Sequence, residues 1–111
     1  MSFEIKPVAG FRKDFKLLSK KYKKLDDDVK KVILELKENP KAGSDLGYNC
    51  YKIRMANSSA STGKSGGFRL IYYFIDEQNN LYLMNIYSKT KKENISENEL
   101  LELLKINGLD K

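Results

Sequence analysis

Three segments between residues 48 and 89 carry the patterning of β-strands, and they constrain the fold more than any other part of the chain. They are YNCYKIRMAN (48–57), FRLIYYFI (68–75) and LYLMNIYSK (81–89). The stretches that separate them, SSASTGKSGG and DEQNN, are rich in residues that favour turns. Strand patterns joined by such connections predict neighbouring antiparallel strands, so we expect a three-strand meander here.

The first of these strands alternates with a period of two, as a half-buried strand requires. Tyr51, Ile53 and Met55 would point to one face of the sheet, and Lys52 and Arg54 to the other. Cys50 and Ala56 would point to the same face as Lys52 and Arg54. The two faces of the sheet should therefore differ, one apolar and one with positive charge.

Two amphipathic helices are expected before the meander. The first has an apolar stripe that steps by four and three residues, formed by Phe11, Phe15, Leu18, Tyr22 and Leu25. Its opposite side carries Lys13, Lys16, Lys20, Lys23 and Lys24. The second helix, LDDDVKKVILELKENP (25–40), would be capped by Asp26, with Asp27 and Asp28 near the positive end of the helix dipole, and would stop at Pro40.

A further helix is expected at the end of the chain, in SENELLELLKING (96–108). Ser96 and Glu99 have the spacing of a capping box, and Gly108 can stop the helix. The segment SFEIK (2–6) alternates and could add a strand to the sheet. The predicted fold class is α+β, in which an N-terminal strand and a two-helix hairpin pack on an antiparallel β-sheet with a C-terminal helix, as one domain over residues 1–111.

The net charge of +6 is concentrated in two zones. Residues 1–25 carry eight Lys and Arg against two acids, and residues 46–75 carry four against none. This distribution suggests a polyanionic partner, with nucleic acid the first candidate and general solubility the alternative. No apolar run approaches the ~20 residues of a membrane span, no signal peptide is expected, and the single cysteine, Cys50, suggests a reducing cytoplasm.

Several kinds of site are excluded by the residues present. The chain has no histidine, which removes Ser–His and Cys–His catalysis and a two-histidine ribonuclease site. The aspartates at 26–28 are explained by the first turn of a helix and have no distant acid cluster to complete a metal site, so no metal or other cofactor is expected. TGKS (62–65) resembles a phosphate-binding loop, but Ser58 stands where the first glycine is required. Gly66 and Gly67 precede a strand instead of a helix, and we interpret them as giving backbone freedom at its entrance.

The remaining chemistry is that of clustered cations. Lys52 and Arg54 share a strand face, Arg69 interrupts the next strand, Lys64 lies in the loop between them and Lys89 follows the last strand. If the strands are neighbours these cations converge, and preorganised Lys and Arg stabilise the extra negative charge of a phosphodiester transition state. The alternative for any one of these cations is a position in a row of surface charges on a solvated face of the sheet. Arg69, inside an apolar strand, needs anionic or carbonyl partners because burying its charge alone is too costly.

The segment YKIRMANSSASTGKSGGFRLIYYFIDEQNNLYLMNIYSK resembles the core of the RelE/ParE toxin superfamily, particularly its HigB-like members. Those proteins have, in this order, a Lys-Ile-Arg strand, a Gly-Lys-x-Gly-Gly loop, an Arg-x-Ile-Tyr-Tyr strand and an Ile-Tyr-x-Lys exit. The helical front, with NPKAG before the sheet, also fits, so the resemblance covers nearly the whole chain.

The resemblance implies a toxin of a type II toxin–antitoxin pair that cuts mRNA in the A site of the 30S subunit without a metal or other cofactor. By position, the implied catalytic residues are Lys52, Arg54, Arg69 and Lys89. RNA contacts are expected from Lys64, Lys91, Lys92, Lys13, Lys16 and Lys20. The expected partners are a cognate antitoxin and mRNA on the ribosome, and the toxin–antitoxin complex would bind operator DNA through the antitoxin.

The sequence departs from the related nucleases at one end of the site. They often carry an arginine directly after the position of Lys89 and a tyrosine a few residues on, whereas here Thr90 follows and no tyrosine lies beyond Tyr87. The group that protonates the leaving 5′-oxygen is therefore unassigned, with Lys89, Lys91 and Lys92 as candidates. Two alternatives stay open: a ParE-like gyrase inhibitor that needs no catalytic cations, and a non-catalytic RNA- or antitoxin-binding module with a decayed site.

Overall fold

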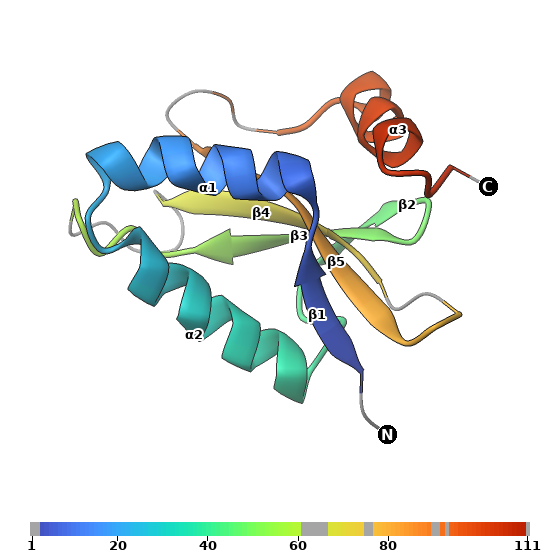
Figure 1. The fold of residues 1–111 in the computed structure, drawn as a ribbon, viewed down its shortest axis with the longest axis horizontal. Coiled ribbons are helices and arrows are strands. Elements are labelled where there is room, and N and C mark those ends of the chain that lie inside the picture. Colours follow the sequence, from blue (N-terminus) through green and yellow to red (C-terminus); the bar gives the residue numbers. More distant parts are fainter. Residues whose placement is uncertain (1–2, 61–66, 75–76, 90–91, 93, 111) are drawn as a thin grey trace.

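The computed structural model describes residues 3–60, 67–74, 77–89, 92 and 94–110. Their elements are, in chain order, β1 (Glu4–Pro7), α1 (Ala9–Lys21), α2 (Leu25–Glu38), β2 (Ser44–Gly47), β3 (Cys50–Met55), β4 (Phe68–Tyr73), β5 (Asn80–Ser88) and α3 (Glu97–Ile106). The strands form one sheet in the order β1-β5-β4-β3-β2 (Figure 1). The predicted α+β architecture is confirmed. None of the described helices is long and apolar enough to cross a membrane.

The sheet differs from the expected one at both of its edges. β1 pairs with β5 in parallel, so the sheet is mixed and not purely antiparallel. The two strands are far apart in sequence, and no hairpin therefore dictates an antiparallel pairing. At the other edge, β2 pairs antiparallel with β3 across a turn in which Tyr48 and Asn49 both have positive φ, 55° and 65°. With Leu46 as its one apolar residue, β2 has no alternation that sequence patterning could detect.

Two apolar cores lie on opposite faces of the sheet. The helix-side core packs α1 and α2 on one face and includes Phe11, Val29, Val32, Leu36, Ile53, Met55, Phe68, Leu70, Tyr72 and Leu83. The α3-side core lies on the other face and consists of Cys50, Ile71, Met84, Tyr87, Leu100 and Leu104. The predicted alternation of β3 is confirmed, because Ile53 and Met55 lie in the first core and Cys50 in the second.

The ends of the helices were predicted with mixed success. Ser96 accepts a hydrogen bond from the Glu99 amide and the Glu99 carboxylate accepts one from the Ser96 amide, so the predicted capping box at the start of α3 is confirmed. The prediction that Asp26 caps the second helix is wrong, because the N-cap is Lys24 and makes no side-chain cap. Leu25, assigned from its spacing to the stripe of the first helix, begins α2 instead and is fully buried.

Asp28 has a structural role that its position in the sequence concealed. It is 3% exposed, and its carboxylate accepts hydrogen bonds from the Ser58 amide (3.0 Å) and the Ser58 hydroxyl (2.5 Å). Asp28 therefore ties α2 to the segment that leaves β3. A buried carboxylate that receives two hydrogen bonds is worth more than an exposed one near a helix dipole.

Gly67, at the entrance to β4, is required by close packing of the backbone. A Cβ atom at this position would lie 2.0 Å from the Met55 carbonyl oxygen and 2.9 Å from the Asn57 amide nitrogen. The sequence-based explanation by backbone freedom is therefore incomplete, because steric exclusion of any side chain decides this residue. Gly66 lies outside the described residues.

Candidate functional site

Two arginines and a tyrosine form a row across the three central strands, on the face that carries the α3-side core. Arg54 of β3 is the register partner of Arg69 of β4, and Arg69 is the partner of Tyr87 of β5. Cross-strand partners on one face lie close enough for their side chains to interact. The fold therefore brings Arg54 and Arg69 together, as the sequence predicted, and adds Tyr87, which it did not.

The two arginines of the row differ in their surroundings. Arg69 is 4% exposed, and its Nη1 donates a hydrogen bond to the Phe68 carbonyl oxygen at 3.1 Å. This contact meets the expectation that a buried arginine in β4 finds a carbonyl partner. Arg54 is exposed. One cation of the pair is thus fixed inside the fold, and the other is accessible to a ligand.

Lys52 lies on the same face, two residues before Arg54. Its Nζ donates a hydrogen bond to Asn94 Oδ1 at 2.7 Å, so the segment that leads into α3 holds the lysine over the sheet. The pairing of β2 with β3 ends at Ser44 and Lys52. A hollow of about 200 Å³ lies beside this end of the hairpin and is lined by Glu35, Ala42, Gly43, Ser44, Lys52, Ile53 and Arg54.

Tyr87 is the part of the row that sequence reasoning missed. Its hydroxyl is buried and makes no hydrogen bond of normal geometry with any described residue. Burial raises the pKa of Tyr87, while Arg69 and the Ile95 amide act in the opposite direction, so the hydroxyl is protonated at neutral pH. Lys92 Nζ lies 4.8 Å from the centre of the Tyr87 ring. Only the register of β5 on β4 could have revealed this neighbour of Arg69.

The lysines at the end of β5 have different positions. Lys89 is two residues beyond Tyr87, and its amide donates to the Gly67 carbonyl oxygen, which places it at the end of the row. Lys92 forms an ion pair with Glu99 at 2.7 Å, so its charge is partly neutralised within the chain. Lys64 and Lys91, two of the predicted RNA contacts, lie outside the described residues.

The remaining predicted RNA contacts do not join the row. Lys13, Lys16 and Lys20 are exposed on α1, as expected from their spacing. Helix α1 packs its apolar side into the helix-side core, whereas Arg54 and Arg69 lie on the opposite face of the sheet. These three lysines therefore belong to a separate basic surface.

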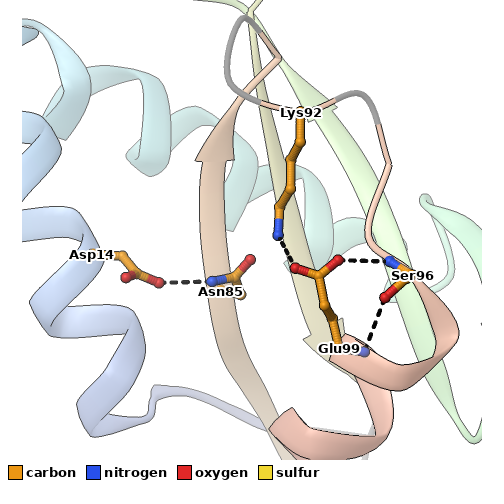
Figure 2. Close-up of polar contacts among 5 residues, drawn as sticks. All are labelled: Asp14, Asn85, Lys92, Ser96 and Glu99. Atoms are coloured by element: carbon orange, nitrogen blue, oxygen red, sulfur yellow. Dashed lines mark hydrogen bonds and ion pairs between the residues drawn. The ribbon is translucent and has the colours of Figure 1, made fainter.

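A polar cluster links α1, β5 and α3 beside the row (Figure 2). Asn85 Nδ2 donates to Asp14 Oδ2 at 2.8 Å, and burial raises the pKa of Asp14 despite hydrogen bonds from Asn85 and the Ile86 amide. On the other side, the hydrogen bond from Lys92, with a further one from Ser96, lowers the pKa of Glu99 to about 2. Figure 2 shows the Asn85 oxygen on the side away from Asp14, toward Lys92.

Two further groups bear on the chemistry that the described residues can support. The described residues contain no group of three or more His, Cys, Asp or Glu side chains arranged to hold a metal ion. Cys50 is fully buried, and burial raises the pKa of its thiol to about 12. The thiol is therefore protonated at neutral pH, in agreement with its interpretation as a small buried residue.

Comparisons with known proteins agree with this fold. The family of the RelE toxin of the RelE/RelB toxin–antitoxin system matches residues 11–109. The isolated E. coli RelE toxin is similar in structure, with a TM-score of 0.59 and 22% identity over 95% of this chain and 99% of that chain. A mutant of E. coli RelE in the free state gives a TM-score of 0.60 and 24% identity over 84% and 90% of the two chains.

A third similar structure is the same E. coli mutant toxin in complex with an antitoxin RelBc peptide. Its TM-score is 0.57 and its identity is 21%, over 87% of this chain and 98% of that chain. At these identities the structural likeness establishes the fold, and the family match over most of the chain establishes the membership. The chain belongs to the RelE toxin family of toxin–antitoxin systems.

Proposed function

We propose that this toxin is an endoribonuclease that cuts mRNA on the ribosome and so inhibits translation. The observation that carries the proposal is the register pair Arg54–Arg69, with Lys52 on the same face. Like charges directly opposite each other in a sheet destabilise it. An anionic ligand bound at the exposed Arg54, beside Arg69, lowers that repulsion, and an RNA phosphate is the anion that a toxin acting on translation would meet.

The proposed chemistry is a transesterification within the RNA. The ribose 2′-oxygen attacks the adjacent phosphorus while Lys52 accepts the 2′-hydroxyl proton. The bond from phosphorus to the 5′-oxygen then breaks, while the exposed Arg54 holds the charge that develops on the phosphate oxygens and the buried Arg69 adds to the positive potential at the site. Of the three lysines considered as the source of the proton for the leaving oxygen, Lys92 is held by Glu99. Lys89, at the end of the row, is the preferred candidate.

This chemistry uses no metal. Lysine and arginine charges replace the cation that a metallonuclease would bring to the phosphate. We therefore propose that the toxin itself needs no metal ion or other cofactor, although ribosomes require magnesium for their own assembly.

The proposed partners are an antitoxin and the ribosome. The similar E. coli toxin structure with an antitoxin peptide supports an antitoxin partner for this chain. Residues 46–75 carry four cations and no acid, so acidic residues on the antitoxin would complement this region. The exposed lysines of α1 are proposed to contact ribosomal RNA, and operator DNA would be bound by the antitoxin.

Arg54→Ala tests the proposal most directly. Arg54 is exposed, so its removal should leave the fold intact, whereas Arg69 is buried and its replacement could unfold the sheet. Loss of one preorganised cation should lower the rate of mRNA cutting on programmed ribosomes by roughly 10²–10³. The matched control is Arg12→Ala. It removes the one other arginine of the sequence, which is also exposed and lines a hollow on the helix side of the sheet, and this variant should cut mRNA at the wild-type rate.

The controls separate the alternatives. Circular dichroism and thermal melting should show that Arg54→Ala is as folded as the wild type. In cells, the wild type should stop growth with translated mRNAs cut and plasmid supercoiling unchanged. If Arg54→Ala stayed fully toxic while DNA breaks accumulated, gyrase inhibition would replace the proposed activity. A harmless wild type that still bound RNA or antitoxin tightly would indicate a decayed site.

A further inference from the structure

A pocket of about 470 Å³ opens between the end of β5 and helix α3. It is lined by Asn85, Lys92, Ile95, Asn98, Glu99, Glu102, Leu103 and Ile106. Its volume is within the range of small-molecule binding sites. Apolar side chains form part of its walls, among them Ile106, which is 70% exposed. The pocket therefore offers an apolar surface beside several polar groups.

The polar groups of the pocket are mainly hydrogen-bond acceptors. Glu99 is already paired with Lys92, so the charge of each is partly neutralised. The side chains of Glu102 and Asn98 make no hydrogen bond or ion pair with any described residue. Asn85 Oδ1 is buried and has no donor among the described residues, and the bond from its amide nitrogen to Asp14 fixes its orientation. The pocket thus favours a ligand that donates hydrogen bonds, and Glu102 makes it unsuitable for a phosphate.

The pocket adjoins the proposed phosphate site. Asn85 lies two residues from Tyr87 on β5, a distance of about 7 Å along a strand. Lys92 lines the pocket and also covers the Tyr87 ring. A nucleotide whose phosphate is held at Arg54 therefore has this pocket within reach of its base or of the next base along the RNA.

We propose that the pocket takes one base of the RNA and favours a base with an exocyclic amino group, adenine or cytosine. The inference rests on the proposed function. The amino group would donate to Glu102 and Asn98, as carboxylate and amide side chains do when they read base edges, while the ring packs on Ile106 and Leu103. The position of the pocket beside the proposed phosphate site favours an RNA base over a cationic side chain of a protein partner, which the test below distinguishes.

Ribosomes programmed with synthetic mRNAs test the proposal. Each adenosine of the A-site codon is replaced in turn by purine riboside, which lacks only the amino group, and the cutting rates are compared. The wild type should cut the adenosine mRNA roughly 5- to 150-fold faster at one codon position. In Glu102→Leu, and in Asn98→Ala as a second variant, the ratio of the cutting rate of the adenosine mRNA to that of the purine riboside mRNA should fall toward one. Glu38→Gln, an exposed glutamate on α2, should keep the wild-type ratio.

Each other outcome overturns the inference in a distinguishable way. If the wild type cuts neither mRNA, the proposed function itself fails. If it cuts both equally at every codon position, the nuclease stands and the base pocket does not. A preference that survives both pocket variants would place base reading elsewhere. If Glu102→Leu weakens antitoxin binding while the ratio is unchanged, the pocket is a protein contact.

Discussion

Replacing Asp28 by alanine should destabilise this protein far more than replacing its neighbour Asp27. The two residues are adjacent in the first turn of α2, and the sequence assigns them the same role near the helix dipole. In the structure Asp27 is exposed, whereas Asp28 is 3% exposed and receives both hydrogen bonds of Ser58. The variants therefore separate a local helix effect from a tertiary contact.

The expected magnitudes follow from these contacts. A hydrogen bond to a charged group contributes about 1.5–3 kcal/mol, and the two bonds end on the two oxygens of one carboxylate, so we expect a loss of about 3 kcal/mol in the free energy of unfolding. An exposed carboxylate in the first turn of a helix contributes about 0.3–1 kcal/mol. For a chain of this length, about 4 °C of Tm accompanies each kcal/mol. Asp28→Ala should thus melt about 12 °C below the wild type, and Asp27→Ala at most about 4 °C below it.

Thermal melting by circular dichroism, with urea unfolding as a second measurement, checks the prediction. Ser58→Ala removes one partner of Asp28, and the double variant Asp28→Ala/Ser58→Ala should lose less than the sum of the two single losses, because both remove the same contact. Equal Tm values for Asp28→Ala and Asp27→Ala, or additive losses in the double variant, would show that the tie between α2 and Ser58 does not support the fold.

Three other predictions concern packing, acid titration and thiol reactivity. Gly67→Ala should lower the Tm sharply or prevent soluble expression because its Cβ would clash with the β3 carbonyl, whereas Gly10→Ala, with no atom within 4 Å, should raise stability slightly through helix propensity. Glu99 should titrate near pH 2 by NMR, and its contribution to stability, complete above about pH 4.5, should be lost as the pH falls toward 2. In the Lys92→Met variant the pH at the midpoint of the Glu99 titration should rise. A midpoint near pH 4.5 in the wild type would contradict the ion pair with Lys92. Cys50 should react with thiol reagents at pH 8 roughly 10³-fold more slowly in the folded protein than in urea, since its pKa is raised to about 12, and rapid labelling of the native state would count against its burial.

Local patterns were sufficient to predict most of the fold. The capping box of Ser96 and Glu99 and the alternation along β3 depend on residues a few positions apart, and the structure confirms both. The β2 strand escaped detection because its four residues carry almost no apolar signal, and it forms only by pairing with β3. The cap of α2 was misassigned because three successive aspartates offered equivalent positions.

The candidate site was predicted in part. The sequence indicated that Lys52, Arg54 and Arg69 are cations on strands, and the register brings Arg54 and Arg69 side by side. It did not indicate Tyr87 as the neighbour of Arg69, nor Asn94 as the partner of Lys52. Both depend on the placement of residues far apart along the chain.

The sequence by itself determined which residues could share a face, because that follows from the periods of the strand and the helix. Only the tertiary structure decided which of those faces meet. The pairing of β4 with β5 contains an irregularity after Ile71, and a shift of one residue there would turn Tyr87 to the opposite face. Packing of the two cores on either side of the sheet fixes this register. The row of Arg54, Arg69 and Tyr87 is therefore a product of core packing, which no local pattern records.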